Sequence, residues 1–310
     1  MKVFHTVKDV VQWRQTQVGD RCQVKIGFVP TMGALHSGHA TLIRESVANN
    51  DFTVCSIFVN PSQFAPDEDL DQYPRTLPQD IELLQSLGCD VLFAPNAHEM
   101  YPQGIPLTVE DQCGPFVTVL GVSEMLEGKT RPNFFRGVAT VVIKLLNIVS
   151  PDKAYFGQKD IQQFIVLATM TKELFMDVEL QMMPIARAEN GLALSSRNKY
   201  LSDETKTIAA SLYAGLHEAE SLINQARMGQ KPLPTRSQVE EAVMSHWNPY
   251  IESNDFKVDY LSIAARSDLS EVTDPRDLNT VPLVISCAVY VTDRVDPTVQ
   301  VRLIDNVLIK

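Results

Sequence analysis

An apolar run followed by a glycine-containing loop decides the fold of this chain: VKIGFVPTMGALHSGHATLIRESV, residues 24–47. The run Val24–Val29 is rich in β-branched and apolar residues and predicts a buried strand. After the loop, the spacing of Leu42, Ile43, Ser46 and Val47 is that of one face of a helix. A strand that leads through a short loop into a helix is typical of a parallel α/β sheet.

The same alternation of apolar runs and helical segments continues to about residue 183. It predicts strands at Val24–Val29, Thr53–Val59, Val91–Ala94, Phe116–Leu120, Ala154–Phe156 and Val178–Met182. Between the second and third of these, Thr76-Leu77-Pro78-Gln79 predicts a capping box and Gly88 a helix C-cap. The helix so enclosed directs Ile81, Leu84 and Leu87 towards the core. We therefore expect residues 1–185 to form a Rossmann-like domain with a parallel sheet.

The pattern changes after Ser195-Ser196-Arg197-Asn198. Helices are predicted from Asp203 to about Met228 and near Gln238–His246, and strands at Lys257–Ala264, Leu283–Val291 and Val299–Ile304. Residues 186–310 are therefore expected to form a smaller α+β domain.

The charge balance argues against nucleic acid as a partner. The chain has 310 residues, with 27 Lys and Arg against 38 Asp and Glu, which gives a net charge of -11. Such a protein repels a polyanion. An acidic protein that binds an anionic nucleotide must instead concentrate its few cations in the pocket.

Cysteines and apolar segments indicate a cytoplasmic protein without a membrane partner. The five cysteines are scattered, contain no C-x-x-C pair and are expected to be reduced. No apolar run is long enough to span a bilayer, and no arginine-rich presequence is present. The acidic segment 67–71 is expected to be a solvated loop and not a metal site.

Two histidines bracket a glycine in the loop between the first strand and its helix. The free N–H groups at the start of the helix form an anion site, and His36 and His39 lie on one face. Gly33 and Gly38 allow close approach of a phosphate. Loop histidines often serve only local hydrogen bonds, but their pairing at this position favours phosphate binding. The H-x-G-H pattern resembles the HIGH signature of nucleotidyltransferases and class I aminoacyl-tRNA synthetases.

Further polar residues follow the predicted strand ends, where open α/β sheets bind ligands. Gln63 and Gln163 offer neutral amides to a hydroxy acid whose carboxylate must stay nucleophilic. Lys159 is suited to phosphates, whereas Asp160 either accepts from ribose hydroxyls or caps the helix. Ser195-Ser196-Arg197-Asn198 either forms an ordinary capped turn or closes over a triphosphate. In combination with the histidine loop, it resembles the KMSKS loop of the synthetases.

Five separated motifs together resemble the pantothenate synthetase family, of fungal type and within the HIGH-motif superfamily. They are Pro30–His39, Phe58–Phe64, Tyr73–Thr76, Lys159-Asp160 with Gln162-Gln163, and Leu192–Asn198. The resemblance implies that ATP and pantoate give pantoyl-adenylate and pyrophosphate, and that β-alanine then attacks to give pantothenate and AMP. It returns at Arg302–Asn306.

The resemblance also implies that the domain of residues 1–185 binds ATP and pantoate and that the domain of residues 186–310 acts as a lid. It further implies roles for single residues. Catalysis is expected of His36, His39 and Lys159. ATP is expected at Met32, Gly33, His36, Gly38, His39, Gly157, Lys159, Asp160, Ala186, Leu194, Ser195, Ser196 and Arg197. Pantoate is expected at Gln63 and Gln163, with Asn60, Tyr73 and Arg131 as secondary substrate candidates. The family further implies Mg²⁺ bound through the triphosphate, no protein metal site, and a homodimer.

One position departs from the family pattern, since many members carry an acidic residue where this chain has Gln158. The change removes a charge near the phosphates but is not expected to alter the chemistry.

Two other functions remain open at this point. A nucleotidylyltransferase acting on a phosphate ester needs only the H-x-G-H loop, although Arg or Lys would suit a phosphorylated acceptor better than Gln63 and Gln163. A non-catalytic tRNA-binding relative of the synthetases is disfavoured by the net charge.

Overall fold

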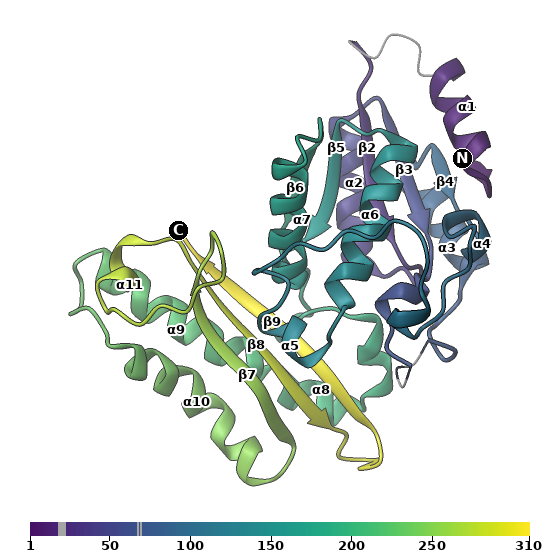
Figure 1. Ribbon diagram of the computed structural model, residues 1–310. Helices are drawn as coiled ribbons and strands as arrows, with labels where there is room; N and C mark the ends of the chain where they lie inside the picture. Colours follow the sequence, from purple (N-terminus) through teal and green to yellow (C-terminus); the bar gives the residue numbers. More distant parts are fainter. Residues whose placement is uncertain (18–22, 67, 69) are drawn as a thin grey trace. The chain divides into compact units, whose positions relative to one another are not determined.

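A computed structural model describes residues 1–17, 23–66, 68 and 70–310. The chain forms two compact units, residues 1–157 with 162–184 and residues 158–161 with 185–310 (Figure 1). The fold class is confirmed, because one unit contains a parallel sheet with helices and the other a small antiparallel sheet. The predicted domain division between residues 185 and 186 stays a prediction.

The first unit is built on a sheet in the order β1-β4-β3-β2-β5-β6, in which every pair of neighbours is parallel. Its strands are β1 (Lys2–Phe4), β2 (Ile26–Thr31), β3 (Phe52–Ile57), β4 (Val91–Phe93), β5 (Lys153–Gly157) and β6 (Glu179–Met183). The strand order reverses between β2 and β5, which are hydrogen-bonded neighbours. Such a reversal marks the carboxyl ends of these two strands as the expected ligand edge.

One strand predicted for this sheet is absent among the described residues, and one observed strand was not predicted. Phe116–Leu120 forms no strand, because the Val117 N–H donates to the side-chain oxygen of Thr140 (2.9 Å) and not to a neighbouring strand. The sequence also gives no sign of the edge strand β1, because its three residues are too short to show a period.

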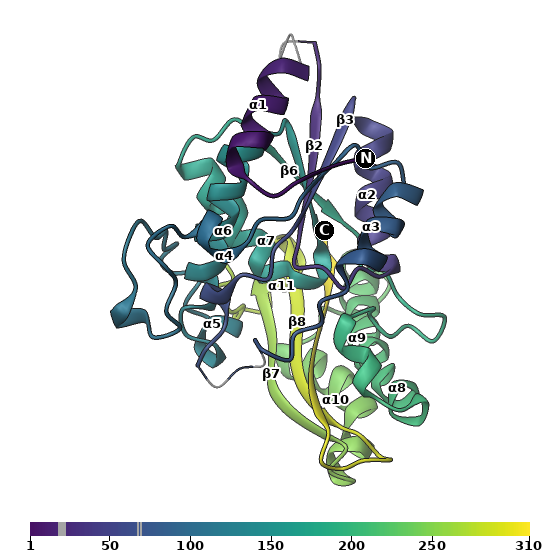
Figure 2. The same ribbon diagram turned by 90° about the vertical axis from the view of Figure 1, so that its right-hand side faces the viewer.

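Helices cover both faces of the sheet. The helices of this unit are α1 (Val7–Gln17), α2 (Ser37–Asn49), α3 (Leu77–Ser86), α4 (Ala97–Met100), α5 (Glu127–Thr130), α6 (Phe134–Val149) and α7 (Ile161–Glu173). Figure 2 shows α2 and α3 on one side of the sheet and α1 and α6 on the other. The α2 and α3 side has a core that includes Leu42, Ile43 and Leu84.

The predicted capping box at the start of α3 is not formed. Thr76 is the N-cap but makes no capping bond, and its hydroxyl donates instead to the Asp80 carboxylate (3.2 Å). The other end of the helix is as predicted, because Gly88 follows the C-cap with a φ of +82°. Leu84 is fully buried, with Ile81 and Leu87 packed around it.

The second unit has a sheet in the order β7-β8-β9, with β7 (Phe256–Ala265), β8 (Leu283–Thr292) and β9 (Gln300–Ile309) all antiparallel. Its helices are α8 (Asp203–Ala209), α9 (Ser211–Arg227), α10 (Arg236–Glu252) and α11 (Asp277–Thr280). The predicted helix 203–228 is therefore two helices that meet at Ala210. The core contains Trp247, which is fully buried and donates from its indole N–H to the carbonyl of Ser211 (3.0 Å).

In the described parts of the chain, no helix combines the length and apolar character that a membrane span requires. The thiols of Cys55, Cys89, Cys113 and Cys287 are free, whereas Cys22 lies outside the described residues. Burial raises the pKa of Cys55 and Cys287, so both thiols stay protonated and unreactive.

Candidate functional site

The two loop histidines cap helix α2. Nδ1 of His36 accepts from the N–H of Gly38 (3.1 Å), and Nδ1 of His39 accepts from the N–H of His36 (3.3 Å). The ring centroids are 4.2 Å apart, so the two imidazoles share one face as predicted. Because Nδ1 accepts in both rings, the neutral form of each ring carries its proton on Nε2 and donates there. The local hydrogen bonds therefore orient both rings as donors.

A buried carboxylate fixes the loop that carries these histidines. Asp80 in α3 is 3 % exposed, and its two oxygens accept from the N–H groups of Ala34 (3.0 Å) and Leu35 (2.8 Å). Gly33 and Ala34 have φ values of +82° and +49°. A Cβ added to Gly33 would lie 3.2 Å from the carboxylate of Asp80 and 3.0 Å from Ile57, so both its φ and its packing require glycine.

Gln63 lies in a buried polar cluster beyond β3. Gln63 is 8 % exposed and is the last residue of the 3-10 helix η1 (Pro61–Gln63). Asn60 donates to Oε1 of Gln63 (2.8 Å) and to the carbonyl of Gly137 (3.2 Å). The hydroxyls of Ser62 (3.0 Å) and Tyr101 (2.8 Å) donate to Oδ1 of Asn60.

This cluster gives Asn60 a supporting role. Both amide donations of Asn60 are directed into the protein, and its residue is 1 % exposed. Burial raises the pKa of Tyr101, so its phenol stays neutral and can donate. Asn60 therefore orients Gln63, whose Oε1 accepts from it and whose NH₂ group remains the donating end.

Arg131 and Glu68 form a two-point ion pair beside Gln63. Nε and one terminal nitrogen of Arg131 each lie 2.7 Å from a carboxylate oxygen of Glu68, and the same terminal nitrogen donates to the carbonyl of Gln63 (3.3 Å). The prediction of a solvated acidic loop is therefore wrong at Glu68, while Asp67 and Asp69 lie outside the described residues. The guanidinium also holds the backbone of Gln63, and its role as a substrate contact stays a prediction.

The remaining substrate candidates are Tyr73 and Gln163. Tyr73 is buried edge-to-face against Phe64, with ring centroids 5.8 Å apart. Gln163 lies half-buried in the first turn of α7. Its neighbour Gln162 is buried and spans the loop before α5, accepting from the N–H of Glu127 and donating to the carbonyl of Val122. The meeting of Gln63 with Gln163 stays a prediction.

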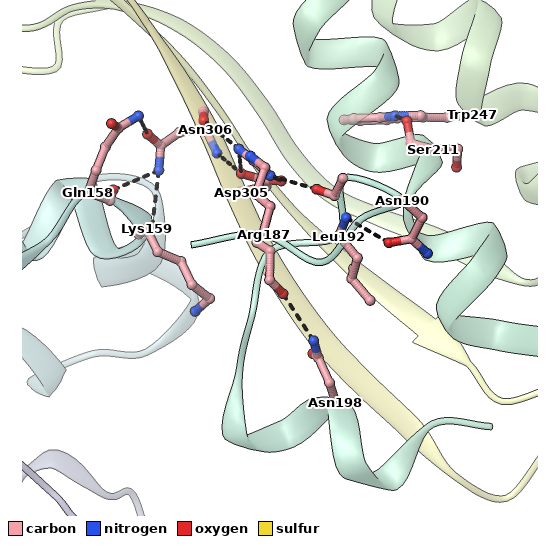
Figure 3. Close-up of polar contacts among 12 residues, drawn as sticks. Gln158, Lys159, Arg187, Asn190, Leu192, Asn198, Ser211, Trp247, Asp305 and Asn306 are labelled. Carbon is pink, nitrogen blue, oxygen red and sulfur yellow. Dashed lines mark hydrogen bonds and ion pairs between the residues drawn. The ribbon is translucent and has the colours of Figure 1, made fainter. Parts of the chain in front are cut away.

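Lys159 lies in the 3-10 turn η3 (Gln158–Asp160), which follows Gly157 at the end of β5. Its ammonium is 4.0 Å from a carboxylate oxygen of Asp160. Asn306 in β9 holds the backbone of this turn, and Figure 3 shows the Lys159 side chain pointing away from that contact. The Gln158 side chain is occupied too, because it donates to the Asn306 side chain (3.1 Å).

The second predicted nucleotide segment forms a narrow hairpin. The N–H of Leu194 donates to the carbonyl of Ala186 (2.9 Å), which brings these two predicted ATP contacts together. Arg187 in the hairpin binds both carboxylate oxygens of Asp305, at 2.6 and 2.8 Å (Figure 3). The following turn, η4 (Ser196–Tyr200), is capped by Ser195, whose hydroxyl accepts from the N–H of Arg197 (3.3 Å).

Sequence reasoning missed the groups that hold these loops in place, namely Asp80, Tyr101, Asp305 and Asn306. Each acts through residues distant in the chain, so no local pattern reveals it. Only Asp305 and Asn306 lie in a stretch that the family resemblance had marked.

The likeness to known proteins extends along the whole chain. The family model for pantoate-beta-alanine ligase matches residues 2–308. Among curated proteins, the chain is 63 % identical to the pantoate-beta-alanine ligase of Saccharomyces cerevisiae over the whole of both chains. It is 42 % identical to the pantothenate synthetase of Acetivibrio thermocellus, again over the whole of both.

Solved structures of pantothenate synthetases also match this chain over nearly its whole length. Pantothenate synthetase from Thermus thermophilus matches with a TM-score of 0.82 and 36 % identity over 99 % of each chain. Pantoate-beta-alanine ligase from Francisella tularensis, crystallised with β,γ-ATP and β-alanine, matches with a TM-score of 0.71 and 34 % identity over 99 % of this chain and 97 % of that one.

Proposed function

Because this chain belongs to the pantoate-beta-alanine ligase family, we propose that it joins pantoate to β-alanine through a pantoyl-adenylate. ATP would supply the adenylyl group, and the products would be AMP, pyrophosphate and pantothenate. The observation that carries the proposal is the pair of donor histidines at the N-terminus of α2, at the carboxyl end of β2.

The proposal assigns the phosphates of ATP to two sets of donors. His36 and His39 would donate from Nε2 to the phosphate oxygens. Lys159, Ser195 and Arg197 are likewise proposed to bind the phosphates. Donors that are already oriented stabilise charge as it develops, without reorganisation during the reaction. They would favour departure of pyrophosphate and attack of the pantoate carboxylate on the α-phosphorus.

The remaining ATP contacts are proposed for the backbone and side chains near these donors. They are Met32, Gly33, Gly38, Gly157, Asp160, Ala186, Leu194 and Ser196. Asn60 and Arg131 would act indirectly by holding Gln63, and Tyr73 would line the pocket.

Pantoate is assigned to Gln63 and Gln163. Neutral amides can bind the hydroxyls of this acid and leave its carboxylate nucleophilic, whereas a tight Arg pair would reduce its reactivity. The Arg131 guanidinium is paired with Glu68, which is consistent with this division of roles.

Mg²⁺ is proposed to bind through the triphosphate, whose oxygens are ligands that it prefers. When bound, the ion would neutralise part of the phosphate charge. A cytoplasmic homodimer is also proposed for this chain, as the family resemblance implies.

An isotope exchange experiment tests the proposed chemistry. Adenylation needs no amine, so the enzyme should exchange labelled pyrophosphate into ATP when pantoate is present and β-alanine is absent. AMP should be the nucleotide product once β-alanine is added. Exchange that requires a phosphorylated acceptor would indicate a nucleotidylyltransferase. Formation of ADP would exclude the adenylate route even if pantothenate is made.

We expect Gln63→Ala to raise KM for pantoate by about tenfold or more, because truncation leaves the acid's polar groups without a partner. KM for ATP should stay within about twofold, since the helix N-terminus of α2 is untouched. Steady-state kinetics with each substrate varied in turn measures both.

Gln79→Ala is the matched control for this substitution. It removes the same side chain from an exposed position in α3 and should leave both constants unchanged. An equal rise of the two KM values in Gln63→Ala would mean that the pocket has collapsed and that no specific contact was lost.

A further inference from the structure

The side chain of Asn306 clamps the turn that carries Lys159. The side-chain nitrogen of Asn306, Nδ2, donates to two successive backbone carbonyls, those of Gln158 (2.9 Å) and Lys159 (3.1 Å). Oδ1 accepts from the Gln158 side chain (3.1 Å), and the residue is 1 % exposed. Both donors and one acceptor of the amide therefore point at a single turn of the chain (Figure 3).

Asn306 is itself held rigidly in β9. It pairs with Ser286 of β8, and its N–H donates to Oδ1 of Asp305 (2.7 Å). Asp305 is 4 % exposed and carries the two-point pair with Arg187. Charged hydrogen bonds of this geometry are stronger than neutral ones and fix direction. The clamp on the Lys159 turn is thus anchored to the strand and to the Ala186–Leu194 hairpin at once.

The chemistry of the clamp is specific for an amide. A carboxylate at this position would keep the acceptor for Gln158 but would turn its negative oxygen towards two carbonyl oxygens. A buried group without its hydrogen bonds is costly, so the turn would have to move. A lysine whose backbone shifts loses the placement of its ammonium, although the ammonium itself is unchanged.

We propose that Asn306 is a positioning residue for Lys159, which it aims at the ATP phosphates by fixing the backbone of the turn. This inference rests on the proposed role of Lys159 in binding ATP. The inference gives β9, the last strand, a part in placing Lys159, although Asn306 lies 147 positions after the lysine in the sequence.

A double-substitution cycle tests the inference. Wild type, Asn306→Asp, Lys159→Ala and the double variant are compared by pantothenate formation with ATP varied. In the wild-type background, Asn306→Asp should lower kcat/KM for ATP by about tenfold, with KM for β-alanine within about twofold. In the Lys159→Ala background the same change should alter kcat/KM by less than about twofold, because residues that act as a unit are not additive.

Two further variants separate positioning from stability. Ser286 is the cross-strand neighbour of Asn306, and its buried hydroxyl has no hydrogen-bond partner among the described residues. Ser286→Ala should therefore leave kcat/KM unchanged. Asn306→Ser introduces no charge and replaces Asn306→Asp in the cycle if the latter does not fold, as judged by thermal unfolding. It is expected to follow the same pattern.

The outcomes distinguish the inference from the function on which it rests. Suppose that Lys159→Ala lowers kcat/KM for ATP, but the Asn306 substitution lowers it by the same factor in the Lys159→Ala background as in wild type. The contact of Asn306 with the turn is then only structural, and the inference is wrong. The inference is also wrong if a folded Asn306 variant keeps wild-type kcat/KM for ATP. If Lys159→Ala retains full activity, the proposed role of Lys159 fails and the inference falls with it.

Discussion

Replacing His39 should lower the rate of adenylation by about 10²-fold or more while the protein stays folded. In the proposed mechanism the ring would donate from Nε2 towards charge that develops on the phosphates, while its Nδ1 accepts from the N–H of His36. Losing one oriented donor at such a position typically costs this much. The measurement is pantoate-dependent exchange of pyrophosphate into ATP, which isolates the first step.

The choice of substitution separates catalysis from capping. Gln is a standard partner at the third position of a capping box, so His39→Gln should keep the helix start and lose only the imidazole. Likewise, Asn is a good N-cap, so His36→Asn should preserve stability, whereas His36→Ala should also lose about 1 kcal/mol. If His39→Gln exchanges pyrophosphate at the wild-type rate, the assignment of this loop to the phosphates is wrong.

Asp80→Ala should reduce activity by about 10²-fold, although Asp80 has no assigned contact with a substrate. Its two oxygens accept from the N–H groups of Ala34, which has a positive φ, and of Leu35, and hydrogen bonds to charged groups contribute about 1.5–3 kcal/mol each. Without them the loop has little to hold its positive φ values, so the histidines lose their fixed direction. Steady-state rates measure the loss of activity, and thermal unfolding of the same preparations measures any loss of stability.

Asp80→Asn is the matched variant. It has the same shape but can accept at one oxygen only, and its NH₂ group must face a second N–H donor. We expect an intermediate loss of activity. Glu82→Gln, an exchange of acid for amide in the same helix, should change little. Wild-type rates in a folded Asp80→Ala protein would show that the loop keeps its conformation without the carboxylate.

The Ala34 and Leu35 contacts of Asp80 show why part of the site is hidden from the sequence. Leu35 and Asp80 are 45 positions apart, and the local pattern around Asp80 indicates only a helix. The motif H-x-G-H marks where the ligand is expected, but the acceptor that orders the loop belongs to another element. Arg131 is a second case, because the family resemblance implies a substrate role for it while no local pattern predicts its ion pair with Glu68.

The amino-acid sequence alone predicted strands β2 to β6 and β7 to β9, the C-cap at Gly88 and the loop of His36 and His39 between a strand and a helix. These features depend on contacts between residues a few positions apart, so a local period or a short motif reveals them. The tertiary structure alone decided that residues 116–120 form no strand, since the partner of Val117 is a side chain of α6. It also decided that Asn306 holds the Lys159 turn, because hydrogen bonds between residues far apart in the chain exist only after the chain has folded.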